Sequence, residues 1–281
     1  MHRFDRPADV RAWSDAARAR GEVVGLVPTM GALHDGHVSL IDLAGQRCDQ
    51  VAVSIFVNPL QFNRPDDFDS YPRTIDDDLA TCDALGVTAV YAPTPATMYP
   101  RGFQTHVEPG PLAETMEGAA RPGHFRGVTT VVTKLFAAVR PDVAVFGEKD
   151  FQQLAIIRRM AEDLDLGIEI VAAATVREAD GLAMSSRNTR LSPPDRVAAP
   201  CVPAALGALA DAAGRERNVE RLLAAAREVI SAEPRARLDY VSVFDPATLE
   251  PLETLETLDG PARAAIAVWL GDVRLIDNRA L

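Results

Sequence analysis

Short runs of almost wholly apolar residues recur along the first two thirds of the chain. Each run is four to seven residues long, too short for a helix that packs as a unit. Runs of this kind are typical of strands whose two faces are both covered in a parallel sheet. They lie at residues 23–27, 51–57, 87–91, 143–146 and 168–171.

Helical patterns fill the gaps between these runs, at residues 38–44, 75–85, 128–139 and 151–164. Regular alternation of strand and helix implies right-handed crossovers that build a parallel sheet with helices on both faces. The predicted fold class is therefore α/β, with a doubly wound parallel sheet. Sheets of this type bind ligands at the carboxyl ends of their strands.

The pattern of apolar and polar residues changes after the segment Arg190-Leu191-Ser192-Pro193-Pro194. Ala-rich helical stretches at 195–213 and 219–232 precede alternating apolar and polar segments at 238–244 and 264–270. We interpret this part as a second, smaller α+β domain. A chain of 281 residues has room for two domains. The predicted division is 1–175 for the parallel-sheet domain and 176–281 for a C-terminal domain that closes over the first.

The amino-acid composition limits the kinds of molecule that this protein is expected to bind. The formal charge is −11, whereas nucleic-acid binding draws its affinity from Lys and Arg that neutralise phosphates. Nucleic acid is therefore not expected as a partner, and an anionic ligand must be met by a local cluster of positive groups.

The three cysteines, Cys48, Cys82 and Cys201, are scattered and lack the spacing of a zinc site. Neither a disulfide framework nor a structural metal is expected, which fits a reducing cytoplasm. The first residues carry no apolar signal core, and no apolar run reaches the roughly 18 residues of a membrane span. We expect neither secretion nor insertion in a membrane.

The first apolar run leads into a segment with the marks of an anion site. Residues 23–27 are followed by Pro28-Thr29-Met30-Gly31 and then by His34-Asp35-Gly36-His37, which opens a helical pattern. A glycine-containing turn that feeds a helix presents free backbone N–H groups to an anion, and histidines three residues apart share one helical face. This predicts a phosphate site with two titratable donors. A pair of surface histidines and half of a metal site are the alternatives.

Two further segments follow strand ends in the same way. Asn58 and Gln61 come after the second predicted strand, where a loop can direct polar amides into the crevice, although Asn-Pro is also a common turn signal. Gly147-Glu148-Lys149-Asp150 closes the strand 143–146. There Asp150 is expected to cap the next helix, and Lys149 in an acidic protein fits a polyphosphate clamp.

Acidic and basic side chains elsewhere allow more than one interpretation. Asp76, Asp77 and Asp78 form either a metal site or only the acidic first turn of a helix capped by Thr74, and the helix dipole explains them sufficiently. Arg121 is a cation on the substrate or phosphate side, or a loop residue only.

Taken together, these segments resemble a known family. His34-Asp35-Gly36-His37 after a first strand resembles the signature of the class I aminoacyl-tRNA synthetase and nucleotidylyltransferase superfamily, and residues 28–37 look more narrowly like the pantoate-β-alanine ligases. Four further segments match that family in order, over about the first 190 residues. They are residues 56–62 (FVNPLQF), 71–78 (YPRTIDDD), 147–153 (GEKDFQQ) and 184–188 (MSSRN).

The resemblance implies an AMP-forming ligase that condenses pantoate with β-alanine through a pantoyl adenylate, with ATP and Mg²⁺. His37, His34, Lys149 and Arg187 would be catalytic, and Gln61, Gln153, Asn58 and Arg121 would bind pantoate or β-alanine. Asp78 is a weak candidate ligand for Mg²⁺, and a homodimer is expected. The residues implied to bind ATP are Met30, Gly31, Ala32, Leu33, His34, Asp35, Gly36, His37, Gly147, Glu148, Lys149, Asp150, Val176, Met184, Ser185, Ser186 and Arg187.

Two departures from the usual pattern keep the chemistry intact. Arg187 stands where many members of the wider superfamily have Lys, and it retains the charge while adding a fork for phosphate oxygens. Leu60 replaces a frequent Met with little change in volume.

Three rival functions stay open at this point. The first is a nucleotidylyltransferase that keeps the nucleotide on its product, which Asn58, Gln61 and Gln153 disfavour because they suit a small hydroxy acid. The second is a catalytically silent nucleotide-binding protein, which would need fewer phosphate donors. The third, aminoacylation of tRNA, is disfavoured by the acidic balance and by the lack of an extra RNA-binding domain.

Overall fold

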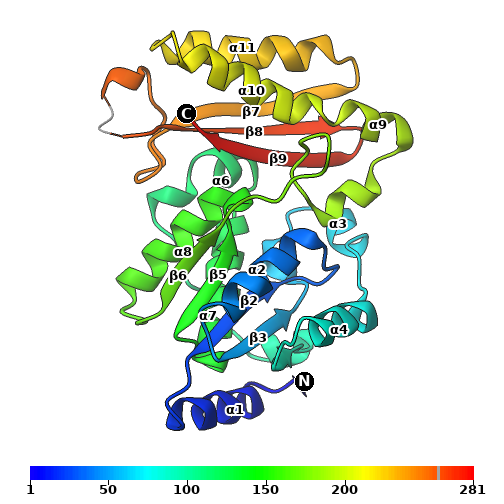
Figure 1. Cartoon of the computed structure of the whole chain (residues 1–281), viewed down its shortest axis with the longest axis vertical. Coiled ribbons are helices and arrows are strands. Elements are labelled where there is room, and N and C mark those ends of the chain that lie inside the picture. Colours follow the sequence, from blue (N-terminus) through cyan, green and yellow to red (C-terminus); the bar gives the residue numbers. More distant parts are fainter. Residues whose placement is uncertain (258–259) are drawn as a thin grey trace. The chain divides into compact units, whose positions relative to one another are not determined.

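The computed structural model describes residues 1–257 and 260–281 and contains two compact units (Figure 1). Unit 1 comprises Met1–Glu148 and Ile156–Ala174, and unit 2 comprises Lys149–Ala155 and Thr175–Leu281. The segment Lys149–Ala155 therefore clusters with the C-terminal unit, whereas the sequence placed it in the first domain. The predicted division into domains 1–175 and 176–281 remains a prediction.

Unit 1 is built on a six-stranded sheet in which every neighbouring pair of strands is parallel. The predicted doubly wound α/β class is confirmed, and all five predicted strands are present with shifts of a few residues at their ends. The spatial order β1-β4-β3-β2-β5-β6 is formed by β1 (His2–Phe4), β2 (Val24–Thr29), β3 (Gln50–Ile55), β4 (Ala89–Tyr91), β5 (Val143–Gly147) and β6 (Glu169–Ala173).

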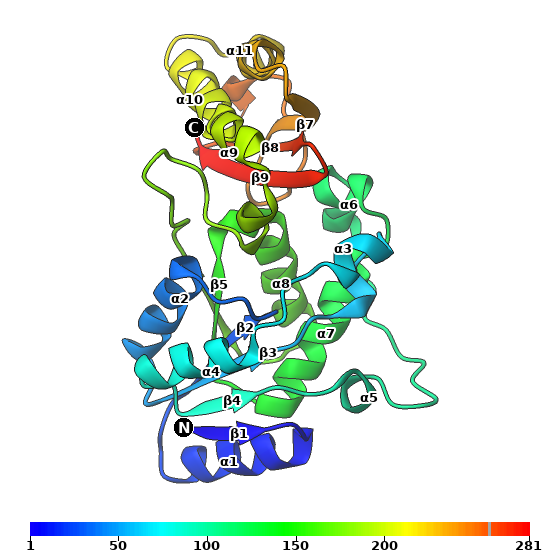
Figure 2. The same ribbon diagram turned by 90° about the vertical axis from the view of Figure 1, so that its right-hand side faces the viewer.

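Helices cover both faces of this sheet (Figure 2). α2 and α4 lie on one side, α7 and α8 lie on the other, and α1 packs against α7. The core under α2 is made of Val27, Leu40, Val53 and Val145 among others, all at most 9% exposed. The main helices are α1 (Pro7–Ala19), α2 (Asp35–Gly45), α4 (Ile75–Ala84), α7 (His124–Val139) and α8 (Phe151–Asp163), with the short α3 (Pro65–Asp69), α5 (Pro95–Met98) and α6 (Met116–Ala120).

The order in which strands are added to the sheet reverses at β2. This strand pairs with β3 on one side and with β5 on the other, so the chain builds outward from it both ways. Loops that leave neighbouring strands on opposite sides of such a point open a crevice at the carboxyl edge. The segments that follow β2 and β5 both start there.

Unit 2 contains a three-stranded antiparallel sheet in the order β7-β8-β9, with α10 and α11 packed against it. Its core includes Leu206, Leu222, Ile266 and Val268, each at most 1% exposed. Gly271, at φ +54°, occupies the tight turn between β8 and β9. The elements are α9 (Pro193–Ala198), α10 (Cys201–Ala213), α11 (Val219–Ala232), β7 (Ala236–Phe244), β8 (Arg263–Leu270) and β9 (Val273–Ala280).

Several elements differ from the sequence-based expectation. The predicted helix at 195–213 is two helices, because Pro200 has no N–H to donate and its ring obstructs the preceding turn. The edge strand β1, the helix α1 and the strand β9 were not predicted. In β9 the apolar residues are interleaved with Arg274 and Asp277, whose charges mask the alternating pattern.

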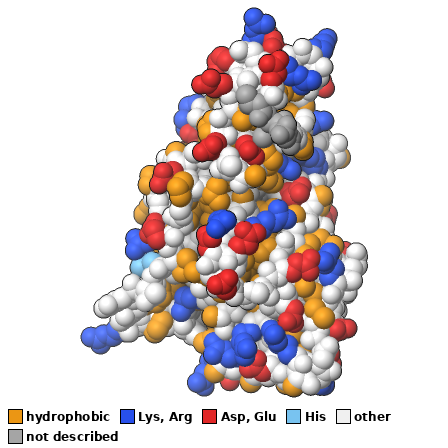
Figure 3. All heavy atoms as spheres, turned by 90° about the vertical axis from the view of Figure 1, so that its left-hand side faces the viewer, with side chains coloured by type: hydrophobic (Ala, Val, Ile, Leu, Met, Phe, Trp, Pro, Cys, Tyr) orange, Lys and Arg blue, Asp and Glu red, His pale blue; other side chains and the backbone are white. Residues whose placement is uncertain are grey.

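The surface carries charges of both signs. Lys, Arg, Asp and Glu side chains are interspersed over the face drawn in Figure 3. None of the helices in the described chain has the length and apolar character needed to cross a bilayer.

Candidate active site

The loop after β2 has an unusual backbone. Gly31 has φ +80° and Ala32 has φ +51°, both in the left-handed region. A Cβ at Gly31 would lie 2.8 Å from Asp78 Oδ2 and 3.2 Å from Ile55 Cγ2. Only glycine therefore combines this φ with so close an approach to the neighbouring side chains.

Asp78 holds this loop in place. Its Oδ2 accepts a hydrogen bond of 3.0 Å from Ala32 N, and its Oδ1 accepts one of 2.8 Å from Leu33 N. Thr74 Oγ1 also donates to Asp78 Oδ2, at 3.3 Å. The sequence assigned Thr74 to capping its helix, but no side-chain cap hydrogen bond is present, because the hydroxyl is directed at this carboxylate.

The geometry of Asp78 supports a structural role more directly than the weak assignment to Mg²⁺. The residue is 2% exposed, and both carboxylate oxygens are engaged by the loop. Among residues 1–257 and 260–281, no three or more His, Cys, Asp or Glu side chains are grouped so that they could hold a metal ion. Asp78 is therefore a structural support for the loop, and its assignment as a ligand of Mg²⁺ stays a prediction.

The two histidines open α2, and their ring orientations are fixed by the backbone. His34 Nδ1 accepts from Gly36 N at 3.1 Å, and His37 Nδ1 accepts from His34 N at 3.3 Å. The ring centroids are 4.1 Å apart. Because each Nδ1 is an acceptor, the proton of each neutral ring is on Nε2. The N-terminus of α2 thus carries two Nε2–H donors beside its own positive dipole end.

The 3₁₀ turn Pro59–Gln61 follows β3, and the two predicted amides lie at its start and its end. Asn58 is 1% exposed, and its Nδ2 donates to Gln61 Oε1 at 2.9 Å and to Gly127 O at 3.1 Å. Its Oδ1 accepts from Tyr99 Oη at 2.7 Å and from Leu60 N at 3.3 Å. These four bonds use the whole hydrogen-bonding capacity of the amide. Asn58 therefore supports Gln61, and its predicted contact with substrate stays a prediction.

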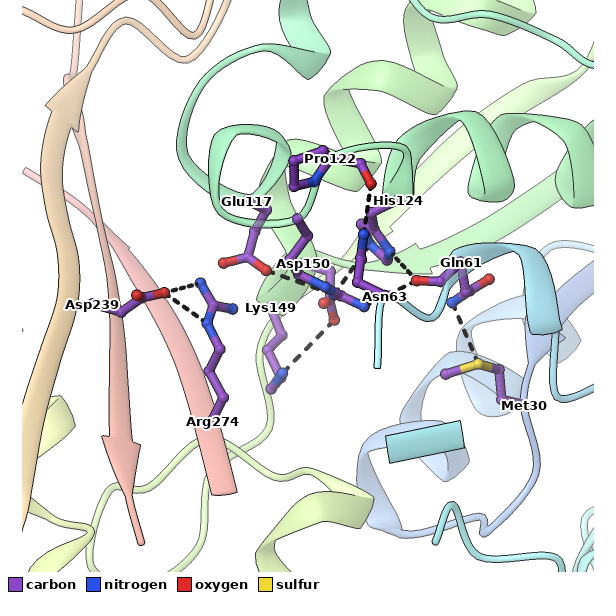
Figure 4. A network of polar contacts seen from close by, with 11 residues as sticks. Met30, Gln61, Asn63, Glu117, Pro122, His124, Lys149, Asp150, Asp239 and Arg274 are labelled. Carbon is purple, nitrogen blue, oxygen red and sulfur yellow. Dashed lines mark hydrogen bonds and ion pairs between the residues drawn. The ribbon is translucent and has the colours of Figure 1, made fainter. Parts of the chain in front are cut away.

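Gln61 is linked to the β2 loop and to α7 (Figure 4). Its Nε2 lies 3.4 Å from Met30 Sδ, which places this amide beside the predicted nucleotide loop. Its main-chain carbonyl accepts from Arg121 Nη2 at 3.1 Å and faces His124 Nδ1 at 2.8 Å. Since a carbonyl only accepts, the His124 proton is on Nδ1.

Arg121 thus has a defined role within unit 1. Besides Gln61, its guanidinium reaches His124 Nε2 at 3.3 Å and Glu117 Oε2 at 3.7 Å. Glu117 is 7% exposed and provides the counter-charge. These contacts make Arg121 a support for the Gln61 backbone. Its predicted contact with substrate stays a prediction.

Unit 2 carries Lys149 and Gln153. Lys149 Nζ lies 3.8 Å from Asp150 Oδ2, and the lysine side chain is 19% exposed. Its main-chain carbonyl accepts a hydrogen bond of 2.8 Å from Asn278 Nδ2 on β9. Gln153, half-buried, lies in the first turn of α8.

The segment 176–187, also in unit 2, has ordered local structure. Met184 N donates to Val176 O at 3.0 Å, and Ser185 Oγ caps a short 3₁₀ turn by accepting from Arg187 N at 3.2 Å. Arg177 makes two hydrogen bonds, of 2.7 and 3.0 Å, to the carboxylate of Asp277 on β9. The strand β9 therefore anchors both the Lys149 segment and the segment that leads to Ser185.

The family model for pantoate-β-alanine ligase matches residues 2–280. The chain belongs to the pantoate-β-alanine ligase family. A pantothenate synthetase of Rhizorhabdus wittichii is 54% identical over 273 residues, covering 97% of this chain and 96% of that protein. One of Heliobacterium modesticaldum is 51% identical over 279 residues, covering 99% and 98%.

Solved structures agree with this membership. A pantothenate synthetase of Thermus thermophilus has a TM-score of 0.92 and 44% identity, covering 99% of both chains. The pantoate-β-alanine ligase of Francisella tularensis, solved with β-γ ATP and β-alanine, has a TM-score of 0.82 and 33% identity, covering 100% of this chain and 97% of that one. This protein is a ligase with the predicted fold.

The polar groups of this ligase form two sets, one in each unit. Unit 1 contains His34, His37 and Gln61, with Gln61 Nε2 beside Met30 Sδ, and it also contains Gly147 and Glu148. Unit 2 contains Lys149, Ser185 and Arg187. Each set is rich in donors, which suits anionic ligands.

Four supporting residues escaped the sequence interpretation: Tyr99, His124, Gly127 and Asn278. His124 had a visible signal, since it follows Arg121-Pro122-Gly123, a positively charged turn before a helix. The others stand in ordinary helical, loop or strand sequence. Only the fold brings Tyr99 and Gly127 to Asn58, and Asn278 to Lys149.

Proposed function

We propose that this ligase joins pantoate to β-alanine while ATP is cleaved to AMP and pyrophosphate, through an enzyme-bound pantoyl adenylate. The observation that carries the proposal is the pair of Nε2–H donors on His34 and His37 at the N-terminus of α2. Two such donors at the positive end of a helix match an anion that gains charge during reaction. The Francisella relative, solved with β-γ ATP and β-alanine, supports the same substrates here.

Two displacements complete the proposed reaction. In the first, a carboxylate oxygen of pantoate attacks the α-phosphorus of ATP, an O–P bond forms, and the bond to pyrophosphate breaks. In the second, the amine of β-alanine attacks the acyl carbon, the amide bond forms, AMP leaves with the former carboxylate oxygen, and the amine loses protons to solvent. Neither step forms a bond to the protein, so catalysis rests on positioning and charge stabilisation.

His34 and His37 are assigned to the first displacement. Negative charge moves onto the departing pyrophosphate, and a donor already oriented toward it stabilises that charge without reorganisation. The fixed rings support this assignment, because main-chain N–H groups hold both Nδ1 atoms and leave Nε2 as the donor. The resemblance gives His37 the closer role, as the proton donor.

Lys149, Ser185, Ser186 and Arg187 are assigned to the polyphosphate. Lys149 supplies a charge and Arg187 a planar fork, and both suit phosphate oxygens. The anchoring of Lys149 by β9 supports this assignment, because a flexible lysine gains precision when its backbone is held. The two serine hydroxyls can donate to the same anion.

Pantoate is assigned to Gln61 and Gln153. A half-buried amide discriminates strongly in favour of a ligand whose oxygen it pairs with, because analogues without that oxygen leave the amide unsatisfied. Gln61 is held on both its side-chain oxygen and its main-chain carbonyl, which supports this role.

The metal ion, the cellular compartment and the oligomeric state are also proposals. Mg²⁺ would arrive bound to the phosphates of ATP, as this ion commonly does. Cys48, Cys82 and Cys201 are free thiols, which suits a reducing cytoplasm. A homodimer is expected from the family resemblance, and sedimentation of the purified protein decides it.

Isotope transfer tests the reaction directly. Pantoate labelled with ¹⁸O in its carboxylate is incubated with ATP and β-alanine, and each substrate is omitted in turn. We expect one ¹⁸O in each AMP formed, and pyrophosphate without β-alanine in an amount limited to about one equivalent per site. Formation of ADP and phosphate, or of unlabelled AMP, would exclude a pantoyl adenylate intermediate.

The same omissions separate the rival functions. Pyrophosphate that forms without pantoate indicates another substrate. A product that retains the nucleotide indicates a nucleotidylyltransferase, and no ATP cleavage under any combination indicates a binding protein.

A further inference from the structure

We infer that Tyr99 is a positioning residue for pantoate, because it fixes the Gln61 carboxamide through Asn58 so that Gln61 presents an N–H donor to the substrate. The inference rests on the proposed function, in which Gln61 binds pantoate. It adds a residue outside the family-like motifs and assigns the polarity of the contact.

The orientation of Asn58 is set by main-chain groups. The carbonyl of Gly127 can only accept a hydrogen bond, so the Asn58 atom 3.1 Å from it is Nδ2. The N–H of Leu60 can only donate, so the Asn58 atom 3.3 Å from it is Oδ1. The reverse orientation would oppose two acceptors at Gly127 and two donors at Leu60, so the amide has one allowed placement.

The orientation of the Gln61 carboxamide is set by its hydrogen bond with Asn58. The second hydrogen of Asn58 Nδ2 points at the Gln61 side chain at 2.9 Å, so the atom that receives it is Oε1. Nε2 is then the outer end of the Gln61 carboxamide, 3.4 Å from Met30 Sδ, a weak acceptor. Gln61 consequently offers a donor, and the ligand atom that meets it must be an acceptor oxygen, of a carboxylate or a hydroxyl.

Tyr99 completes the chain of bonds. Its hydroxyl donates to Asn58 Oδ1 at 2.7 Å. The ring packs against Phe56, with centroids 6.1 Å apart, and against Phe103, at 5.0 Å, which fixes where the hydroxyl lies. Burial raises the pKa of the Tyr99 hydroxyl, so it stays protonated and donates throughout the physiological range.

Removal of this hydroxyl tests the inference. Tyr99→Phe keeps the ring and leaves one acceptor site of Asn58 unfilled. Gly127 and Leu60 still set the orientation of the Asn58 amide, but Asn58, and Gln61 with it, is held less firmly. We expect the KM for pantoate to rise about tenfold and the melting temperature to fall slightly, because a buried hydrogen bond is lost, while the KM for ATP stays within experimental error of wild type. The matched control is Tyr91→Phe, which removes another buried tyrosine hydroxyl in unit 1, from β4. It should leave all three quantities unchanged.

A double-mutant cycle distinguishes positioning from general packing. If Tyr99 acts through Gln61, then Tyr99→Phe has no further effect on the pantoate KM once Gln61 is replaced by Ala. Asn58→Ala serves as a second variant and should show the same coupling. Additive effects in the Gln61→Ala background would overturn the inference, as would a wild-type pantoate KM in Tyr99→Phe.

Failure of the proposed function would look different. In that case wild-type protein itself shows no pantoate-dependent cleavage of ATP. A wild-type enzyme that turns over pantoate while Tyr99→Phe behaves like Tyr91→Phe refutes only the role of Tyr99.

Discussion

The side-chain amide of Asn278 donates a 2.8 Å hydrogen bond to the main-chain carbonyl of Lys149, a residue 129 positions earlier in the chain. Asn278 is 5% exposed, and its Oδ1 accepts from Arg263. The preceding residue on β9, Asp277, binds Arg177, which leads into the segment with Ser185. Two adjacent residues of one strand therefore hold two separate parts of the proposed phosphate site.

Asn278→Ala should loosen Lys149 without removing it. The carbonyl of Lys149 loses its partner, which costs about 1–3 kcal/mol of stability if it stays buried, and turnover should fall by about tenfold. Urea unfolding and steady-state kinetics measure the two effects. The control Arg279→Ala changes the exposed neighbour on the same strand and should alter neither. Unchanged turnover in Asn278→Ala would show that this anchor has no part in catalysis.

His37→Asn separates the two nitrogens of this ring. The Asn side chain can still accept from His34 N in place of Nδ1, but it cannot reach as far as Nε2. We expect pantoate-dependent pyrophosphate release to fall on the order of 100-fold or more, with little change in melting temperature. His37→Ala should lose similar activity and also the hydrogen bond at the start of α2. Near-normal release by either variant contradicts the assigned role.

Asp78→Asn should disturb the nucleotide loop. One carboxylate oxygen becomes an NH₂ group that must face the N–H of Ala32 or Leu33, leaving that donor unsatisfied. We expect a loss of about 1–3 kcal/mol in the free energy of unfolding, together with a raised KM for ATP. Asp77→Asn, on the exposed side of the same helix, is the control. Equal behaviour of the two variants would argue against the support role of Asp78.

Gly127→Ala tests how closely α7 approaches the Gln61 turn. A Cβ at this position would lie 2.2 Å from Leu60 O and 2.7 Å from Gln61 N. Alanine favours a helix by up to about 1 kcal/mol relative to glycine, so any destabilisation must come from this clash. We expect lower stability and a raised pantoate KM. Gly207→Ala, in α10 with nothing within 4 Å of its Cβ, should instead stabilise the protein slightly.

Acid should weaken the ion pair that joins Asp180 to Arg196 on α9. The hydrogen bond from Arg196 lowers the pKa of Asp180 below its ordinary value. An aspartate of this kind contributes stability that is complete above the unfolded pKa of about 3.9 and is lost as the pH falls through the lower folded value.

The pair is about one third exposed, with side chains at 34% and 33%, so its contribution should stay below about 1 kcal/mol. Urea unfolding of wild type and Asp180→Asn measures it. The difference between them should be present at pH 6 and shrink towards pH 2. A difference that is constant across this range excludes the ion pair as its source.

Local sequence patterns determined many of the strands of this protein and the segment that forms its proposed anion site. The apolar runs at 143–146 and 168–171 became β5 and β6 because a strand buried on both faces needs little beyond apolar residues. Residues 28–37 could be recognised as an anion site because glycine, histidine and a helix start are adjacent in sequence. Elements without such a signal were missed, as with β9, where charged residues interrupt the alternation.

What sequence could not decide is which distant residues hold the site together. Gln61 is oriented by Asn58, which depends on Tyr99 and Gly127, 41 and 69 positions away from it. The carboxylate of Asp78 could equally have bound a metal, capped a helix or held a loop, since all three need the same side chain. Hydrogen bonds depend on the distance and direction between two groups in space, and for residues far apart in the chain these are fixed only by the packing of the sheet and its helices. Sequence therefore determined the chemistry available to this ligase, and tertiary structure decided which of its polar groups act as supports and which direct a donor outward.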